Sequence, residues 1–390
     1  MKRYFTLAAL LAAIGSNAQV GIGTTTPLAR LHVVDGSVLF STTGDIPISY
    51  LPTPISGEGR RMMWYDEKAA FRVGYVGSWG ATYWDEANIG NYSFGTGYNT
   101  RASGAHSFAA GLATTASGDE SVAIGNNSTA SADRALSFNG TASAVGAIAM
   151  GSGAQAVQDD ALALGPSAIA SGLASIAIGP SISPGNFAVA IGLQNRAAGQ
   201  FSVAIGKNAR VNHQGSCVIG DASASFSSDS VYSSANNQMT MRYVNGFRLF
   251  TSQNLSSGVT LAAGGGSWAS VSDFRKKENF QEIDKEDILK KVAGIPITNW
   301  NYKTQSSAQR HIGPMAQDFY KAFHLDGIGN DTTINTVDID GVNMVAIQAL
   351  ESRTVQLQEE NDQLKASLDA MNKRMAAMEE MMSAQSRKRK

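Results

Sequence analysis

The sequence contains only one cysteine, Cys217, among its 390 residues. One cysteine forms no disulfide within a chain, so a disulfide framework is excluded as a source of stability. Cys217 takes the place of a valine in a repeated phrase, and we interpret it as a small core hydrophobe. The histidines show no metal-ligand spacing with it; they are His32, His106, His213, His311 and His324. The repeated glycines match no nucleotide-binding fingerprint, so the sequence predicts neither a metal site nor a cofactor.

Charged side chains are also sparse, at 16% of the residues, and the net charge at pH 7 is −1. Proteins that bind nucleic acid or an anionic membrane surface carry a basic excess. We therefore expect no nucleic-acid partner. The charges are unevenly distributed, because residues 272–390 hold 35 of the 63 and the preceding 271 residues hold 28. Two unlike regions meet near residue 271.

Long apolar runs are scarce as well. The one at residues 5–14 follows Lys2 and Arg3 and precedes Ser16-Asn17-Ala18, which is the pattern of a secretory signal peptide cut before Gln19. No later apolar stretch reaches the ~18 residues of a membrane helix, and no cysteine follows the cleavage site to carry a lipid. The sequence predicts a secreted or cell-surface protein without a transmembrane anchor.

What the sequence does have is one phrase that recurs between residues 92 and 220. A clear copy reads Ser121-Val-Ala-Ile-Gly125, and its alternation of small and large apolar side chains predicts a short strand. Ala116-Ser117-Gly118 is one of the small-residue turns that precede the copies. The ten copies close at residues 97, 111, 125, 139, 151, 165, 179, 192, 206 and 220. One period is thus one coil of two strands and two turns, and ten stacked coils would make a rod of about 45–50 Å.

This phrase resembles the head repeat of trimeric autotransporter adhesins. The resemblance implies a left-handed parallel β-roll in which three chains pack side by side, and hence a homotrimer. From the residues alone, a monomeric β-solenoid is the alternative. A single coil buries almost nothing, so stacking and lateral association must supply the core.

The segment Arg60 to Asn91 is dense in aromatic residues and leads directly into the first coil. Such a segment could bind glycans, because sugar faces stack on rings, or it could close the end of the roll. We expect a cap. Any glycan-binding or hydrolytic activity is expected to map to this segment.

Two pairs of carboxylates, Asp119-Glu120 and Asp159-Asp160, invite comparison with a glycosidase, which uses two carboxylates. Both pairs occupy the same phase of the repeat, just before the strand. We therefore interpret them as solvated turn residues.

A different pattern begins at Ser272. Ser272-Asp-Phe-Arg-Lys-Lys277-Glu-Asn279 is followed by Ile295-Pro-Ile-Thr-Asn-Trp-Asn-Tyr302, by Ile312-Gly-Pro-Met-Ala-Gln317 and by Val337-Asp338. These blocks, over about residues 270 to 365, resemble the intramolecular chaperone peptidase of phage endosialidases and tail spikes.

That resemblance implies a domain that trimerises, helps the preceding fibre to form and then cuts itself off in a single turnover. It assigns Ser272 as the nucleophile, Lys277 as the base and Val271–Ser272 as the scissile bond. Among the histidines only His311, beside the Ile312-Gly block, could assist this pair, and for it we expect a structural role first. The chain departs from the family at Lys276, where leucine is common, and at Pro314, where a bulky apolar residue is usual. Both departures concern packing around the pair.

From the residues alone, the same run is a solvated, basic helix start with Ser272 or Asp273 as N-cap. A serine hydroxyl needs an adjacent base to act as a nucleophile. A spacing of five residues lies off one face of both a helix and a strand. A local bend or a neighbouring chain must therefore bring Ser272 and Lys277 together.

From Ile347 onward, apolar residues recur at spacings of three and four, which predicts a coiled coil of five heptads. The core positions are Ile347, Leu350, Thr354, Leu357, Asn361, Leu364, Leu368, Met371, Met375, Met378 and Met382. Asn361 would fix the register at some cost in stability. The basic tail from Arg387 is interpreted as a solvated end.

The predicted fold is mainly β: a trimeric parallel β-roll fibre, a small α+β chaperone domain and a coiled coil. The predicted boundaries are a signal peptide at 1–18, a β/aromatic cap region at 19–91, head repeats at 92–221, a connector at 222–271, the chaperone peptidase at 272–346, the coiled coil at 347–384 and a basic tail at 385–390.

We therefore expect a secreted, adhesin-like or tail-fibre-like homotrimer whose only enzymatic activity is autoproteolysis, with a glycan or protein receptor on a host or surface as partner. Two alternatives stay open. One is a tail-spike-like protein that binds or degrades carbohydrate at residues 60–91 or at subunit seams. The other is a fibre that keeps its C-terminal domain as a trimerisation anchor.

Overall fold

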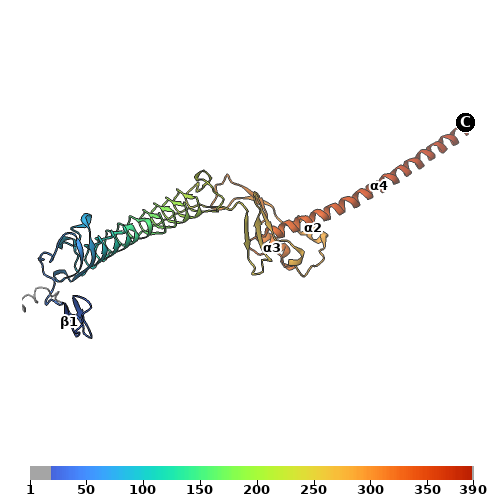
Figure 1. Ribbon diagram of the computed structural model, residues 1–390. Coiled ribbons are helices and arrows are strands. Elements are labelled where there is room, and N and C mark those ends of the chain that lie inside the picture. Colours follow the sequence, from blue (N-terminus) through green and yellow to red (C-terminus); the bar gives the residue numbers. More distant parts are fainter. Residues whose placement is uncertain (1–18, 389–390) are drawn as a thin grey trace, which may run out of the picture. The chain divides into compact units, whose positions relative to one another are not determined.

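The computed structural model describes residues 19–388 (Figure 1). The chain forms two compact units, Met1–Asn245 and Gly246–Lys390. The predicted signal peptide at 1–18 lies outside the described residues. None of the helices between residues 19 and 388 is both long and apolar enough to cross a membrane.

A small parallel pair opens the described part of the first unit. It joins β1 (Val20–Ile22) to β2 (Leu31–Val33). The chain then runs without regular structure to β3 (Gly59–Tyr65), which turns back through the 3₁₀ helix η1 (Asp66–Lys68) to β4 (Ala70–Val76). The 3₁₀ helices η2 (Ser78–Gly80) and η3 (Glu86–Asn88) follow.

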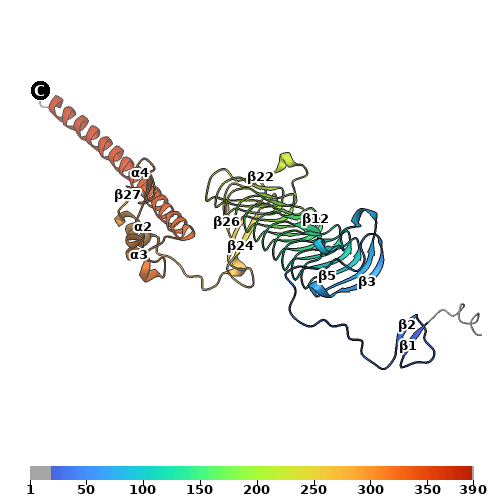
Figure 2. The ribbon, with the colours of Figure 1, turned by 90° about the vertical axis from the view of Figure 1, so that its left-hand side faces the viewer.

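The main body of the first unit is a parallel β-solenoid, visible in Figure 2 as a stack of coils between β5 and β22. Each coil contributes a first strand and a shorter second strand. The first strands are β5 (Phe94–Tyr98), β7 (Phe108–Leu112), β9 (Val122–Asn126), β11 (Leu136–Ala142), β12 (Ile148–Ala156), β13 (Leu162–Leu164), β15 (Ile176–Ile178), β17 (Val189–Leu193), β19 (Val203–Lys207), β21 (Cys217–Gly220) and β23 (Met239–Arg242). The second strands are β6 (Arg101–Ala102), β8 (Thr115–Ala116), β10 (Thr129–Ala130), β14 (Ile169–Ala170), β16 (Ile182–Ser183), β18 (Arg196–Ala197), β20 (Ala209–Val211) and β22 (Val231–Tyr232), while β11 and β12 run on through the corner. The predicted mainly β solenoid is confirmed.

Alanine fills the interior of the solenoid. In the phrase at Val122-Ala-Ile124 the alanine is fully buried, and it stands in register with Ala109 below and Ser137 above. Ser137 can occupy this buried column because its hydroxyl has an acceptor: it donates to the Gly140 carbonyl at 2.7 Å. The large side chains of each first strand point the other way and are only half-buried. One face of the solenoid is therefore an apolar surface two side chains wide.

The aromatic segment closes the N-terminal end of this stack. Strand β4 pairs antiparallel with β3 and parallel with β5, and Arg72 stands in register with Gly95. Arg72 is fully buried, and its guanidinium donates to the Ser93 carbonyl, the Ser93 hydroxyl and the Ala102 carbonyl at 2.8–3.0 Å. Burial lowers the pKa of Arg72 to about 10. A Cβ on Gly95 would lie 2.9 Å from the Arg72 Cδ, so a glycine at this position leaves space for the buried Arg72 side chain, which we call the Arg72 plug.

The rings of this segment pack on the first coils. Phe71 stacks on Phe94 and Phe94 on Phe108, with centroids 5.5 and 5.3 Å apart. Trp84 is 1% exposed and donates to the Thr100 carbonyl at 2.9 Å. These contacts use the ring faces that a sugar would need.

The parallel pairing continues past the last copy of the phrase. Strands β22 and β23 pair with β20 and β21, and a loop with the 3₁₀ helix η4 (Ser227–Asp229) connects β21 to β22. The solenoid thus reaches Arg242, which lies inside the segment predicted as a connector. The alternation of Met239-Thr-Met-Arg242 suits a further rung although the closing glycine is missing.

The second unit begins with an antiparallel sheet of β24 (Phe247–Phe250), β25 (Gly258–Leu261) and β26 (Trp268–Ser270). The 3₁₀ helix η5 (Phe274–Lys276) follows, then α2 (Lys285–Gly294), the pair β27 (Thr298–Trp300) and β28 (His311–Gly313), α3 (Ala316–Phe323), η6 (His324–Asp326) and α4 (Thr336–Lys388). The first turns of α4 pack on α2 and α3 around a core that includes Ile288, Phe319, Phe323 and Val342. This arrangement is the small α+β region that was predicted, with α4 beginning before the heptads.

Candidate functional site

Ser272 and Lys277 lie side by side just after the end of a strand. The Val271 N–H donates to the Gly258 carbonyl of β25 at 3.0 Å, which holds the backbone beside the sheet up to the residue before Ser272. The Lys277 Nζ then lies 2.8 Å from the Ser272 Oγ. The bond that the sequence singles out, Val271–Ser272, is therefore fixed on one side and next to a hydrogen-bonded Ser–Lys pair on the other.

A single 3₁₀ turn explains how residues five apart can meet. The Asp273 carboxylate accepts the Arg275 N–H at 3.0 Å and so caps η5. The turn brings Lys277 back over Ser272 within one chain. Of the two routes expected from the sequence, the local bend is the one that the structure shows. The N-cap interpretation also holds for Asp273, so capping and pairing coexist.

The other two cations of the run have partners of their own. Arg275 forms an ion pair with Asp273, Nη2 to Oδ2 at 2.8 Å, and this hydrogen bond lowers the pKa of Asp273. Lys276, which replaces the common leucine, donates to the Leu255 carbonyl at 3.0 Å, in the loop between β24 and β25. Only Lys277 is directed at Ser272.

The surroundings of the pair are open in the single chain. Ser272 and Lys277 are both exposed. Phe274 and Phe280 stack on each other at 4.7 Å, yet remain 73% and 60% exposed. Two bare phenyl rings beside a polar pair are typical of a surface that another chain covers.

His311 lies in a different group. Its Nε2 is 3.0 Å from the Gln305 Oε1, and its ring contacts Trp300 and Tyr302, with centroids 4.8 and 5.7 Å apart. None of these contacts involves Ser272 or Lys277. The structure therefore does not bring the predicted assisting residue to the pair.

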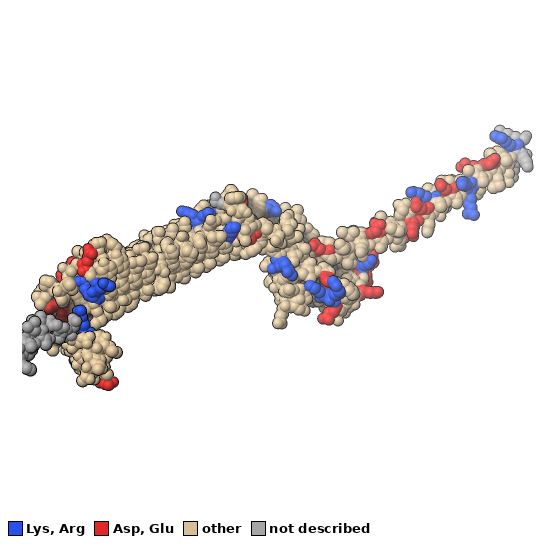
Figure 3. Space-filling view, viewed as in Figure 1, with Lys and Arg blue, Asp and Glu red and all other residues tan. Residues whose placement is uncertain are grey.

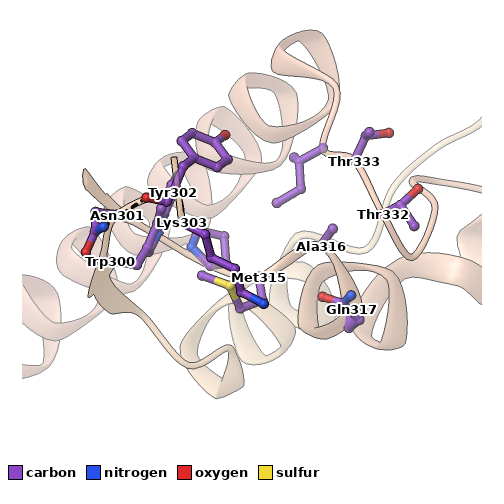
Figure 4. Close-up of a pocket in the computed structure, with 11 residues that line it drawn as sticks. Trp300, Asn301, Tyr302, Lys303, Met315, Ala316, Gln317, Thr332 and Thr333 are labelled. Carbon is purple, nitrogen blue, oxygen red and sulfur yellow. Dashed lines mark hydrogen bonds between the residues drawn. The ribbon is translucent and has the colours of Figure 1, made fainter. Parts of the chain in front are cut away.

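A pocket of about 600 Å³ opens near that aromatic group, between the β27–β28 connection, the start of α3 and the loop before α4 (Figure 4). Its lining includes Trp300, Lys303, Pro314, Met315 and Gln317. The Trp300 Nε1 is buried and has no hydrogen-bond partner in the described part of the chain. The lining contains no nucleophile next to a base. Sequence reasoning missed this pocket, although most of its lining residues come from two of the blocks noted above.

The paired carboxylates of the solenoid connect neighbouring coils. Asp119 Oδ1 accepts the Ala105 N–H at 2.8 Å, and Asp159 Oδ1 accepts the Val145 N–H at 3.1 Å, fourteen residues earlier in each case. Glu120 and Asp160 occupy the left-handed corner beside them, with φ of 58° and 56°. Asp119 and Asp159 thus hold turns together through their carboxylates, and all four residues are exposed, as their phase in the repeat indicates.

Comparison with known families finds a match in a segment of each unit. The family model for the YadA head domain repeat matches residues 116–138, 142–168, 156–181 and 184–209, all in the solenoid. The family model for the chaperone of endosialidase matches residues 272–327, beginning at Ser272. No curated protein matches the chain. The chain thus carries YadA-type head repeats followed by a domain similar to the endosialidase chaperone.

Proposed function

We propose that this protein is an exported, homotrimeric, adhesin-like fibre whose C-terminal domain acts as an assembly chaperone and then cuts the Val271–Ser272 bond. The head repeats support the fibre and a surface or secreted location, and the family match from Ser272 supports the chaperone. The observation that carries self-cleavage is the 2.8 Å contact between Lys277 Nζ and Ser272 Oγ, directly after the strand end.

The proposed reaction is an acyl shift from nitrogen to oxygen. The Ser272 hydroxyl oxygen attacks the Val271 carbonyl carbon while its proton passes to the neutral Lys277 amine, and from there to the departing Ser272 nitrogen. The C–O bond forms as the C–N bond breaks, which leaves an ester and a free α-amine. Water then hydrolyses the ester to give the Val271 carboxylate and to restore the hydroxyl.

Two apolar surfaces support a trimer. The first strands of the solenoid present columns of half-buried Val, Ile and Leu, such as Val122 and Ile124. The heptad residues of α4 are exposed in the single chain, with Leu364 at 68% and Met382 at 71%. A continuous apolar stripe is rarely left exposed to water on an isolated helix. The heptad spacing of this stripe suits a coiled coil.

Assembly would also control the reaction. A lysine accepts a proton only as the neutral amine, and removal of water favours that form. The exposed rings of Phe274 and Phe280 mark the surface that a neighbouring chain would cover. Cleavage would then follow assembly, so that the released domain reports a finished fibre.

Intact-mass measurement and denaturing gels on the purified chain test this proposal. The wild type should yield fragments 19–271 and 272–390, whereas Ser272→Ala and Lys277→Ala should each remain full-length trimers. Ser270→Ala is the matched control, because Ser270 lies on β26 just before the bond, and it should still be cut. A cut at the same bond in Ser272→Ala would refute the mechanism. A wild-type trimer that stays uncut would instead favour a retained trimerisation anchor.

A further inference from the structure

A groove of about 570 Å³ lies on the second-strand face of the solenoid, near its C-terminal end. Outward side chains of the last coils, including Ile182 and Arg210, form its floor. The corner residues Gln194 and Asn208 and the side chain of Phe226 also line it. Phe226 belongs to the loop that precedes β22, an element labelled in Figure 2. The apolar columns proposed as the trimer interface belong to the first strands. The groove would therefore stay open in the proposed trimer.

Asn208 is the residue of this groove that has a buried side-chain oxygen without a hydrogen-bond partner in the described part of the chain. At the equivalent corner one coil earlier, Gln194 is exposed, whereas Asn208 is only 1% exposed beneath the loop. Its Nδ2 reaches the Phe226 carbonyl at 3.5 Å. Its Oδ1 is buried without a hydrogen-bond donor among the residues described. A buried acceptor left unpaired is unfavourable, so the site is suited to a ligand that brings a hydroxyl.

The charge around the groove has one sign. Residues 161–220 contain the cations Arg196, Lys207 and Arg210 and no aspartate or glutamate. Arg196 and Arg210 stand in register on neighbouring coils, and the Arg210 Nε makes one long contact, 3.5 Å, with the Ser230 hydroxyl. Figure 3 shows Lys and Arg gathered on this end of the solenoid beside a middle section almost without charge. The outer face of the guanidinium is available to an anion.

The nearby carboxylates, Asp221 and Asp229, already form an ion pair and hydrogen bonds within the protein. Asp221 pairs with Arg242, Nε to Oδ1 at 3.3 Å, and accepts the Val244 N–H at 2.8 Å. Asp229 accepts the backbone N–H of Phe226 at 3.3 Å. These bonds hold the loop that presents Phe226, whose ring is 73% exposed.

We propose that this groove binds an acidic saccharide. Arg210 would hold a carboxylate through its planar fork, a sugar hydroxyl would donate to Asn208 Oδ1, and a sugar face would lie on the Phe226 ring. Three cations are too few for a nucleic-acid backbone, whose binding scales with the number of phosphates neutralised. An acidic peptide does not present a series of hydroxyl groups to the side-chain amides of Gln194 and Asn208. The site is at the opposite end of the solenoid from the aromatic cap.

Titration calorimetry on the full chain carrying Ser272→Ala, which keeps the fibre uncut, tests the proposal with a galacturonic acid hexamer as the probe. The hexamer should bind, its neutral methyl ester should bind at least about tenfold more weakly, and Arg210→Gln should cost a similar factor. Arg101→Gln is the matched control, because Arg101 has the same strand position in the first coil. It should change the affinity less than about twofold.

Two variants separate binding from folding. Asn208→Gly suits the left-handed corner at φ 54° and removes the side chain with its amide. It should weaken binding about fivefold with an unchanged circular dichroism spectrum. Phe226→Ala should weaken binding about tenfold, since the ring is exposed and supports no core. The proposal is overturned if the hexamer does not bind at millimolar concentration. It is also overturned if Arg210→Gln and Asn208→Gly bind the hexamer as tightly as the chain without these substitutions. Tighter binding of a sulfated dextran hexamer, a thymidine oligonucleotide or an acidic peptide overturns the assignment to a carboxylated sugar.

Discussion

The solenoid and the C-terminal unit are stabilised in opposite ways. The solenoid interior is a stack of methyl groups, as at Ala149, Ala163 and Ala177, joined by hydrogen bonds from one coil to the next. The C-terminal unit has large side chains, Phe319 and Phe323, packed between three helices. A coil of alanines has little to bury until its neighbours exist, whereas α2, α3 and the start of α4 can form a core by themselves. The comparison suggests that the second unit folds first and organises the first.

The strongest test of that order removes most of α4. A chain that ends after Arg353 keeps Ala349, which is buried against Leu289, and keeps the ion pair of Arg353 with Glu286. It loses almost the whole heptad stripe, so we expect complete loss of trimers and of cleavage although Ser272 and Lys277 are intact. Native mass spectrometry would measure both.

The matched control for this truncation ends after Ala384 and removes only the basic tail. It should remain trimeric and be cut as the wild type is. Stable trimers of the chain that ends after Arg353, or efficient cleavage in its monomer, would contradict the proposed order.

The second test weakens the large-residue core. Phe319→Ala should destabilise the C-terminal unit by about 3–5 kcal/mol, because it removes a fully packed ring and leaves a cavity. We expect slow or failed assembly of the solenoid as a consequence, measured by denaturant unfolding of the isolated fragment 272–390 and by the yield of trimer. A normal trimer yield from the chain with this destabilised unit would show that assembly of the solenoid does not depend on the stability of the C-terminal unit.

The third test overfills the small-residue core. Ala163→Leu should destabilise the solenoid by about 1–3 kcal/mol or more, because the column has no space beyond a methyl group. Leu162→Ala changes the adjacent, outward position and is the control. This substitution should lower the thermal stability of the solenoid little in a monomer and more in a trimer. Thermal unfolding at two protein concentrations distinguishes these cases.

The fourth test is the pH dependence of the loop after β21. Burial alone would raise the pKa of Asp221, but hydrogen bonds from Ser223, the Val244 N–H and Arg242 outweigh it and lower that pKa to about 2. The folded-state pKa is thus below the unfolded value of about 3.9. The stabilisation is fully present above about pH 4 and is lost as the pH falls toward 2. Asp221→Asn should flatten this part of the stability profile, whereas an unchanged slope would show that other carboxylates cause it.

The smallest effect is expected at the turn carboxylates. In Asp159→Asn the side-chain oxygen can still accept the Val145 N–H, so stability should change by less than about 0.5 kcal/mol. Replacing Asp159 and Asp160 together by Asn should leave any saccharide binding unchanged. A large loss in calorimetry would revive a catalytic role for these residues.

The periodic features could be predicted from the sequence and the irregular ones could not. The repeat fixes strand positions because the small–large alternation recurs with a nearly constant spacing. The buried Arg72 breaks this rule: a guanidinium takes a place in the alanine column because Ser93, just before β5, and Ala102, on β6, supply acceptors. The last rung at Met239 has no closing glycine and is recognised only by its pairing.

The candidate site shows the same division. Residue types and the family resemblance indicated Ser272 and Lys277, but their contact depends on one 3₁₀ turn capped by Asp273, which spacing rules do not foresee. His311 carried no independent signal beyond its position near a block, and its partners are Gln305 and two rings. The groove under Phe226 arises from a loop without periodicity folding over a periodic surface.

The Arg72 plug has a consequence for filament growth. A stack of identical parallel coils has no natural end, because each exposed rung is a template for the next, as in cross-β fibrils. At the N-terminal end the chain reverses direction between β4 and β3, so the outermost strand no longer matches an incoming coil. Arg60 and Arg61 on that strand add like charge, and the buried guanidinium occupies the column that another alanine would extend. The N-terminal end of the solenoid is therefore a poor template for stacking a second solenoid on it.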